Sequence, residues 1–154
     1  MGPRKGIHEL IDLAKTVTKD GERLLISTSW TRRSVPTPET VASSDYILLH
    51  GNGMVDSNLV SKSVDDTRAV STYTTKPIMF NEDDHFNFDQ PLNNFTAALS
   101  RHAGWGYFDP ATGAGGTPFY GDYENGFQCP PVNWGINTER KKAFYAFCKE
   151  VTGV

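Results

Sequence analysis

The chain alternates between segments whose hydrophobic residues recur at helical spacing and short runs in which hydrophobic residues are continuous. The helical spacing predicts amphipathic helices over residues 7–17, 57–73, 91–102 and 137–151. Pro38 favours the start of a further short helix over 39–42. Each continuous run ends in polar residues, and the runs begin near positions 24, 46, 77 and 104. The predicted order is one helix followed by four units of strand, polar loop and helix.

The predicted strands are hydrophobic throughout rather than alternating, which indicates burial on both faces. Strands of this kind, separated by helices, are typical of a parallel sheet covered by helices. We therefore predict an α/β fold of four parallel βα units. The 154 residues suffice for one ordinary domain, so residues 1–154 are expected to form a single domain. A long loop at 113–131, rich in glycine, proline and aromatic residues, precedes the last helix, and loops of this length are often functional.

Composition and charge narrow the class of partner. The formal net charge is −3 and the pI is about 5.8, which gives no basic footprint for nucleic acid. No segment holds the roughly 20 apolar residues that a membrane helix needs, so no membrane partner is expected. The sequence shows no dinucleotide fingerprint, phosphate loop or zinc-ligand spacing, so we expect no cofactor and no metal. The two cysteines, Cys129 and Cys148, define no disulfide framework, and the cellular compartment stays undetermined.

Polar side chains gather where the predicted strands end. In parallel α/β sheets and barrels, these ends converge on one cleft. The residues found there carry indole, imidazole, amide and carboxylate groups, namely Trp30, His50, Asn52, Glu82, His85 and Trp105. Sugars present flat C–H faces that stack on aromatic rings, and hydroxyls that bind amides and carboxylates. The strand ends therefore indicate a carbohydrate site, and cleavage of a glycoside would need two carboxyl groups that flank the bond.

A resemblance to a known family extends over nearly the whole chain. It rests on the succession LLISTSW, YILLHGNG, KPIMFNEDDH, HAGWGYFDP and NWGINTERKKAFYAFCKEV. This succession resembles the second half of a (β/α)8-barrel, or TIM-barrel, glycoside hydrolase. The family is the superfamily of retaining enzymes whose acid/base follows the fourth strand and whose nucleophile follows the seventh. The resemblance implies half of a TIM barrel, strands five to eight, with Glu82 as the nucleophile that attacks the anomeric carbon.

The resemblance also implies roles for the other strand-end residues. His50, Asn52 and His85 would orient the nucleophile or bind substrate hydroxyls. Trp105, expected as an exposed ring between two glycines, lies at the end of the eighth strand, where a sugar-stacking tryptophan is common in this family. Trp30 would complete that platform. The implied partner is therefore a carbohydrate, an oligo- or polysaccharide.

The chain departs from the family pattern in two ways. It holds no fourth strand and hence lacks the acid/base motif that follows it, and a complete barrel takes about 250 residues. The dipeptide Asn81-Glu82 itself resembles that acid/base motif, so Glu82 is either the nucleophile or the general acid. We expect this chain alone to be inactive. Its four parallel strands would leave two edge strands unpaired, which predicts either self-association or a missing N-terminal half-barrel.

Two hypotheses from other classes stay open. A non-catalytic carbohydrate-binding module would use the same aromatic rings and amides for binding without chemistry. A small open-sheet α/β protein of unrelated function would bind no sugar and would fold as a monomer. The sequence leaves both the sugar and the linkage undetermined.

Overall fold

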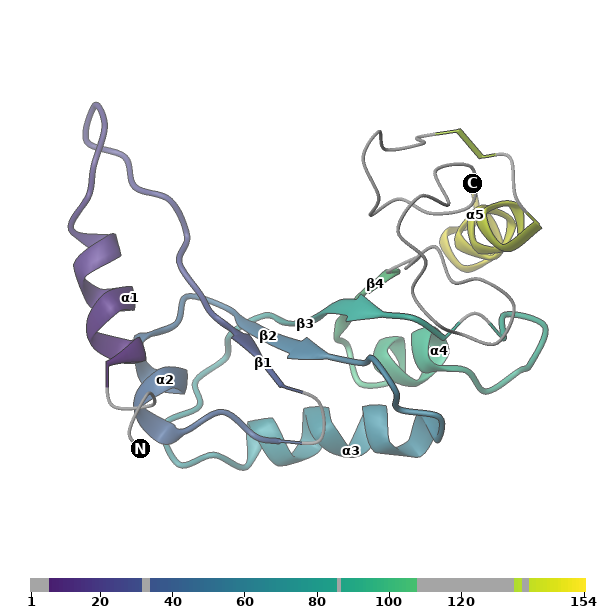
Figure 1. The fold of residues 1–154 in the computed structure, drawn as a ribbon, viewed down its shortest axis with the longest axis horizontal. Helices are drawn as coiled ribbons and strands as arrows, with labels where there is room; N and C mark the ends of the chain where they lie inside the picture. The colour runs from purple at the N-terminus through teal and green to yellow at the C-terminus, as the bar shows by residue number, and fades with distance from the viewer. Residues whose placement is uncertain (1–5, 32–33, 86, 108–134, 137–138) are drawn as a thin grey trace, which may run out of the picture.

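The structure is a computed structural model that describes residues 6–31, 34–85, 87–107, 135–136 and 139–154. The long aromatic loop predicted at 113–131 and Cys129 lie outside the described residues. The described residues form five helices and four strands (Figure 1). In chain order these are α1 (Ile7–Lys15), β1 (Ser29–Trp30), α2 (Pro38–Ser43), β2 (Ile47–His50), α3 (Ser57–Arg68), β3 (Ile78–Asp83), α4 (Asn94–Leu99), β4 (Gly104–Tyr107) and α5 (Glu139–Thr152).

Side-chain caps explain where three of the helices begin. Thr37 and Asp56 precede α2 and α3, and each accepts a hydrogen bond from a backbone N–H of the first turn. Asn93 and Thr96 form a reciprocal capping box at the start of α4. This helix therefore begins later than the predicted position 91, because the backbone of the cap residue Asn93 is extended, with φ −133° and ψ 174°.

The four strands form one parallel sheet in the order β1-β2-β3-β4. Neighbours in the sheet are therefore neighbours in the sequence, with a helix in each connection. This arrangement confirms the predicted α/β class and the four-stranded parallel sheet. Because the strands are parallel, their carboxyl ends all lie at the same edge of the sheet, where His50, Asp83 and Tyr107 follow the apolar parts of the strands.

One face of the sheet carries the core of the molecule. Inward-facing strand residues pack there against α2, α3 and α4, which lie together on the same side in Figure 1. The strand contribution is Ile47, Leu49, Ile78 and Phe80, and the helix contribution is Val41, Val60, Val64, Ala97 and Ala98. These positions alternate along β2 and β3, as expected when one face of a strand is buried.

The opposite face of the sheet is not covered by any described helix. Leu48 is only half-buried there, and Met79, its register partner on β3, is 40% exposed. The prediction of burial on both faces is therefore wrong for the described chain. The physical reason is the strand order: parallel crossovers nearly always share one hand, so successive connections between successive neighbours place their helices on the same side.

The first strand begins later than predicted. The apolar run that predicts a strand near position 24 is exposed, with Leu24 at 80% and Leu25 at 69% of their surface accessible. Only Ser29–Trp30 pairs with β2. Asp45 holds the preceding segment instead, because its backbone N–H donates to the Ile26 carbonyl and its carboxylate accepts from the Ile26 N–H. The predicted strand at 24 is therefore wrong.

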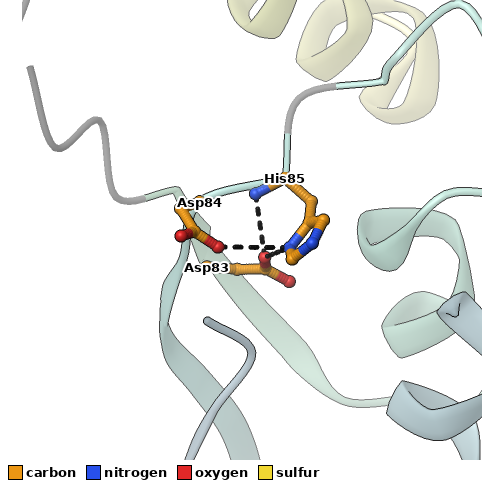
Figure 2. A group of neighbouring side chains, drawn as sticks. All are labelled: Asp83, Asp84 and His85. Carbon is orange, nitrogen blue, oxygen red and sulfur yellow. Dashed lines mark hydrogen bonds and ion pairs between the residues drawn. The ribbon is translucent and has the colours of Figure 1, made fainter. Parts of the chain in front are cut away.

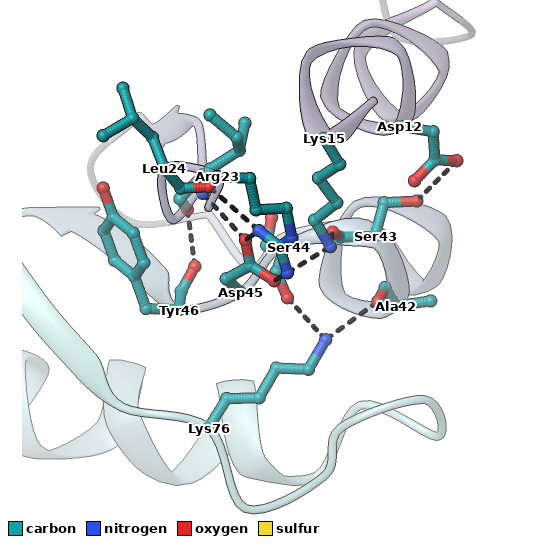
Figure 3. A network of polar contacts seen from close by, with 12 residues as sticks. Asp12, Lys15, Arg23, Leu24, Ala42, Ser43, Ser44, Asp45, Tyr46 and Lys76 are labelled. Atoms are coloured by element: carbon teal, nitrogen blue, oxygen red, sulfur yellow. Dashed lines mark hydrogen bonds and ion pairs between the residues drawn. The ribbon is translucent and has the colours of Figure 1, made fainter. Parts of the chain in front are cut away.

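A charged network lies at the amino-terminal edge of the sheet (Figure 3). The Asp45 carboxylate accepts hydrogen bonds from the Arg23 guanidinium at 2.7 and 3.0 Å and forms an ion pair with Lys15 at 3.0 Å. The hydrogen bond from Arg23 is the main reason that the pKa of Asp45 lies well below its usual range. Lys15 also donates to the Ser43 carbonyl, so this network ties α1 to the end of α2.

Lys76 closes the last turn of α2 from the start of β3. Its Nζ donates to the carbonyl oxygens of Val41, Ala42 and Ser44 at 2.6, 2.8 and 2.6 Å. These carbonyls lack partners within the helix, and a cation at this end also complements the helix dipole. Burial lowers the pKa of the Lys76 amine, so part of the stabilisation is offset by desolvation.

Replacing Lys76 by methionine should lower the free energy of unfolding by about 1–3 kcal/mol, because charge-assisted hydrogen bonds to helix carbonyls are lost. Urea unfolding measures the change. Lys62→Met is the matched control: its ammonium pairs with Asp66 on the surface of α3, so its loss should cost less than about 1 kcal/mol. Equal effects of the two substitutions would show that the three carbonyl contacts of Lys76 stabilise the fold no more than the surface ion pair of Lys62 does.

Candidate functional site

A β-bulge near the end of β3 decides which way its polar side chains face. The register pairs Leu49 with Phe80 but His50 with Glu82, so β3 holds one more residue than β2 at this point. A second irregularity on the β4 side lies between Phe80 and Asp83. As a result both Phe80 and Asp83 are buried, although three positions apart they would face opposite sides of a regular strand. Two polar clusters follow from this geometry.

The first cluster joins Ser29, His50, Asn81 and Glu82, from three neighbouring strands, and is called the exposed cluster here. The Ser29 hydroxyl lies 2.5 Å from His50 Nε2 and donates to Asn81 Oδ1 at 2.9 Å. A hydroxyl has one proton, so His50 Nε2–H donates to Ser29. The Glu82 carboxylate lies 4.0 Å from His50 Nε2, and the Glu82 side chain is 37% exposed.

The polar groups of the exposed cluster are only partly used. Within the described chain, the Glu82 carboxylate accepts no hydrogen bond, and Asn81 Nδ2 and His50 Nδ1 have no partner. Nearby in the β2–α3 loop, Asn52 Oδ1 is buried and likewise has no partner among the described residues. The cluster therefore presents the Glu82 carboxylate, the Asn81 amide donor and the acceptor His50 Nδ1, which can bind a ligand.

The second cluster surrounds Asp83, which is fully buried, and is called the buried cluster here. Asp83 Oδ2 accepts from Asn94 Nδ2 at 2.8 Å and from Trp105 Nε1 at 2.9 Å. Asp83 Oδ1 accepts from the backbone N–H and from Nδ1 of His85 at 3.0 and 2.7 Å. Asn94 is itself fixed, because it also donates to the Met54 carbonyl at 2.9 Å. A buried carboxylate with this set of donors is fully hydrogen-bonded.

His85 belongs to the buried cluster and not to the exposed one. Figure 2 shows two carboxylates directed at the same nitrogen of its imidazole, with Nδ1 at 2.7 Å from Asp83 Oδ1 and 3.2 Å from Asp84 Oδ1. The hydrogen bond to Asp83 raises the pKa of His85, and the charges of both carboxylates add to that effect against the cost of burial. Asp84 in turn accepts from the Gly53 N–H at 3.1 Å and so reaches the β2–α3 loop.

The three residues of Figure 2 offer one ligand atom each to a cation, and these atoms lie within 4.8 Å of one another. Both Asp83 oxygens, however, already accept two hydrogen bonds each, and the short contact between Asp83 and His85 Nδ1 is occupied by a proton. The arrangement is accounted for as a hydrogen-bonded network. A cation would have to displace these donors.

The two tryptophans do not form the sugar platform that the sequence suggests. Trp30 is 7% exposed and belongs to the core. Trp105 is stacked on Phe95 and on Tyr107, with ring centroids 5.2 and 6.0 Å apart, and its indole N–H is bound to Asp83. The expected exposed ring at Trp105 is therefore wrong. Glycine neighbours do not expose it, because Phe144 from α5 also packs against it.

Four residues that the sequence did not mark as site residues belong to the two clusters or contact them: Ser29, Gly51, Asn81 and Asn94. Asn81 directly follows an apolar run and Ser29 lies shortly after another, and these positions were the signal available in the sequence. Gly51 begins a tight turn, because its carbonyl accepts from the Met54 N–H at 2.9 Å. A Cβ at Gly51 would also lie 2.3 Å from Asp83 Oδ2. Asn94 carries no sequence signal, because its partners come from three separate segments.

Comparisons with known proteins add no assignment: no family model, curated protein or solved structure to which the chain was compared matches it. The case for a function therefore rests on the geometry of the strand ends. Among the described residues, no helix has the length and apolar character needed to cross a membrane.

The contribution of His85 to stability should depend on pH. Because its pKa is raised in the folded state, the stabilisation is fully present below the unfolded value of about 6.5 and is lost as the pH rises through the folded value. The free energy of unfolding of the wild type should therefore fall from acidic to alkaline pH more steeply than that of His85→Gln. Urea unfolding between pH 5.5 and 8.5 measures both.

His102→Asn provides the control, because His102 has no carboxylate partner among the described residues and asparagine tolerates its positive φ of 50°. This variant should keep the wild-type slope. A wild-type curve parallel to that of His85→Gln would show that the imidazole between Asp83 and Asp84 has no electrostatic role in folding.

Proposed function

We propose that this chain is half of a (β/α)8-barrel glycoside hydrolase of the retaining type, corresponding to strands five to eight, with Glu82 as its catalytic carboxylate. The observation that carries the proposal is the Glu82 side chain itself. It is a partly exposed carboxylate at the carboxyl end of a parallel sheet, without a hydrogen-bond donor in the described chain and 4.0 Å from an imidazole. Function gathers at this end of parallel sheets and barrels.

The uncovered face of the sheet supports a half-barrel over an open sheet. A doubly wound sheet reverses its strand order so that helices cover both faces. Here the order is sequential, and α2, α3 and α4 share one face. In a barrel the other face is the interior, filled by side chains such as those of Leu48 and Met79. A chain with four such strands needs further strands to close that interior.

In the proposed reaction, Glu82 attacks the anomeric carbon and a second carboxyl group protonates the leaving oxygen. In retaining enzymes the two groups stand about 5–5.5 Å apart. His50 and Asn52 would orient Glu82 or bind substrate hydroxyls, and Asn81 Nδ2 adds a donor beside it. If Glu82 serves instead as the general acid, the missing group is the nucleophile.

A specific observation favours a second candidate, carbohydrate binding without catalysis. The carboxylates next to Glu82 in sequence are not available as a second catalytic group: Asp83 is buried and hydrogen-bonded, and Asp84 contacts His85 and the Gly53 N–H. General-acid catalysis contributes about 100- to 10,000-fold. The described residues alone therefore form a binding site more readily than a complete active site.

The proposed substrate class is tested by titrating neutral oligosaccharides of several linkages into the isotopically labelled chain. We expect amide resonances of His50, Asn81 and Glu82 to shift with at least one sugar, because these groups have unused hydrogen-bonding capacity. No hydrolysis of unactivated oligosaccharide should accompany binding. Shifts in Asp66→Asn, a surface control on α3, should match the wild type.

Glu82→Gln separates the two candidates. A hydrolysis rate of the purified chain that this substitution abolishes would show that the active site is already complete. Sugar binding that Glu82→Gln leaves unchanged would favour the binding module. The absence of any shift with any sugar would contradict both candidates and favour an unrelated open-sheet protein.

The uncovered face also predicts association. We expect the purified chain to sediment as a dimer or larger species, because the face around Leu48 and Met79 and the two sheet edges lack a partner in the described chain. Met79→Lys should shift the population to monomer. Leu92→Lys, at a residue that is 54% exposed before α4, is the control and should not.

A wild type that stays monomeric at high concentration would rule out self-association. The half-barrel proposal would then require a separate N-terminal half as the partner.

A further inference from the structure

The buried cluster and the exposed cluster are joined at consecutive residues of β3. Glu82 faces the open side, and Asp83 is wholly buried on the helix-covered side. Asp83 is held by donors from two other elements, Asn94 of α4 and Trp105 of β4. The backbone of the β2–α3 loop approaches so closely that a Cβ at Gly51 would lie 2.3 Å from Asp83 Oδ2 and 2.6 Å from its Cγ.

The same loop is bonded to the backbone of Glu82. The Gly51 N–H donates to the Glu82 carbonyl at 2.7 Å, next to the point where the register between β2 and β3 shifts. Gly51 therefore has two neighbours in β3: the main chain of Glu82 and the side chain of Asp83. The absence of a side chain at Gly51 allows both contacts at once.

We infer that Asp83 is a positioning residue for Glu82: its buried carboxylate fixes the bulge that turns Glu82 to the open face of the sheet, beside Asn81. A role of Asp83 in catalysis rests on the proposed function, whereas the geometry of the bulge is independent of that function. In a regular strand Phe80 and Glu82 would share a face, so Glu82 would point toward the helices. A shift of one residue reverses the face of every side chain that follows it.

Energetics favour the bulged arrangement only while Asp83 keeps its donors. An ionised carboxylate is buried at high cost unless it is hydrogen-bonded. The four donors that converge on Asp83 meet this requirement. They match an ionised carboxylate, because both of its oxygens are acceptors. Asparagine at position 83 would direct an amide N–H₂ at donors such as Trp105 Nε1. The hydrogen bonds that favour burial of residue 83 would then be lost.

Carboxylate footprinting tests the inference without any sugar. Carbodiimide and glycine ethyl ester label accessible carboxylates, and tandem mass spectrometry locates the label. In the wild type we expect Glu82 to react and Asp83 to stay unlabelled. In Asp83→Asn the labelling of Glu82 should fall severalfold relative to Asp66, an exposed carboxylate on α3 that serves as internal reference.

Gly51→Ala is the second variant, because it keeps Asp83 but places a methyl group where the carboxylate lies. It should lower the labelling of Glu82 and allow labelling of Asp83. Gly6→Ala, where a Cβ meets nothing within 4 Å, is the matched control and should leave both unchanged. If Asp83→Asn fails to fold, Trp105→Phe removes one donor and should give a smaller decrease.

Unchanged labelling of Glu82 in folded Asp83→Asn and Gly51→Ala would overturn the inference and leave Asp83 with a purely structural role. This result is distinguishable from failure of the proposed function. A chain that binds no sugar but loses Glu82 labelling in these variants would contradict the glycoside hydrolase proposal and leave the positioning role of Asp83 intact.

Discussion

A parallel sheet whose strands follow chain order places its connecting helices on one face, and this constraint shapes the whole molecule. The helices α2, α3 and α4 bury one face of β2 and β3. The other face, with Leu48 and Met79, is left for something else to cover. The exposed cluster lies at the carboxyl end of the same sheet. The face that the helices leave open is therefore also the face at which Glu82 is accessible to a ligand.

The consecutive carboxylates Glu82 and Asp83 have opposite environments. Asp83 is fully buried and accepts four hydrogen bonds, so its charge is satisfied within the fold. Glu82 is partly exposed and accepts none among the described residues. A satisfied buried carboxylate is a structural anchor, whereas an unsatisfied one beside an imidazole is available for chemistry. The sequence does not reveal this difference, because it is created by the bulge in β3, and the bulge depends on how β3 pairs with its neighbouring strands.

The sequence predicts the elements whose signals are local. Helical spacing and caps locate the helices, and the apolar runs before His50 and Asn81 locate β2 and β3. The run at Leu24 misleads, because an exposed surface segment and a buried strand look alike over three residues. The exposure of Trp105 could not be predicted either, since its covering rings come from distant segments. Hydrogen-bond partners such as Asn94 likewise depend on tertiary contacts that leave no local pattern.

The polar run at the end of β3 carries three adjacent carboxylates, which would repel one another if all faced one site. The fold separates them. Asp83 turns into the core, and Asp84 reaches the Gly53 N–H. Both carboxylates contact Nδ1 of His85, and the hydrogen bond to Asp83 is the main reason that the pKa of His85 is raised. When protonated, His85 offsets part of the negative charge on the buried side of the strand. Glu82 lies beside His50 at the open face, so a ligand that binds there meets its carboxylate.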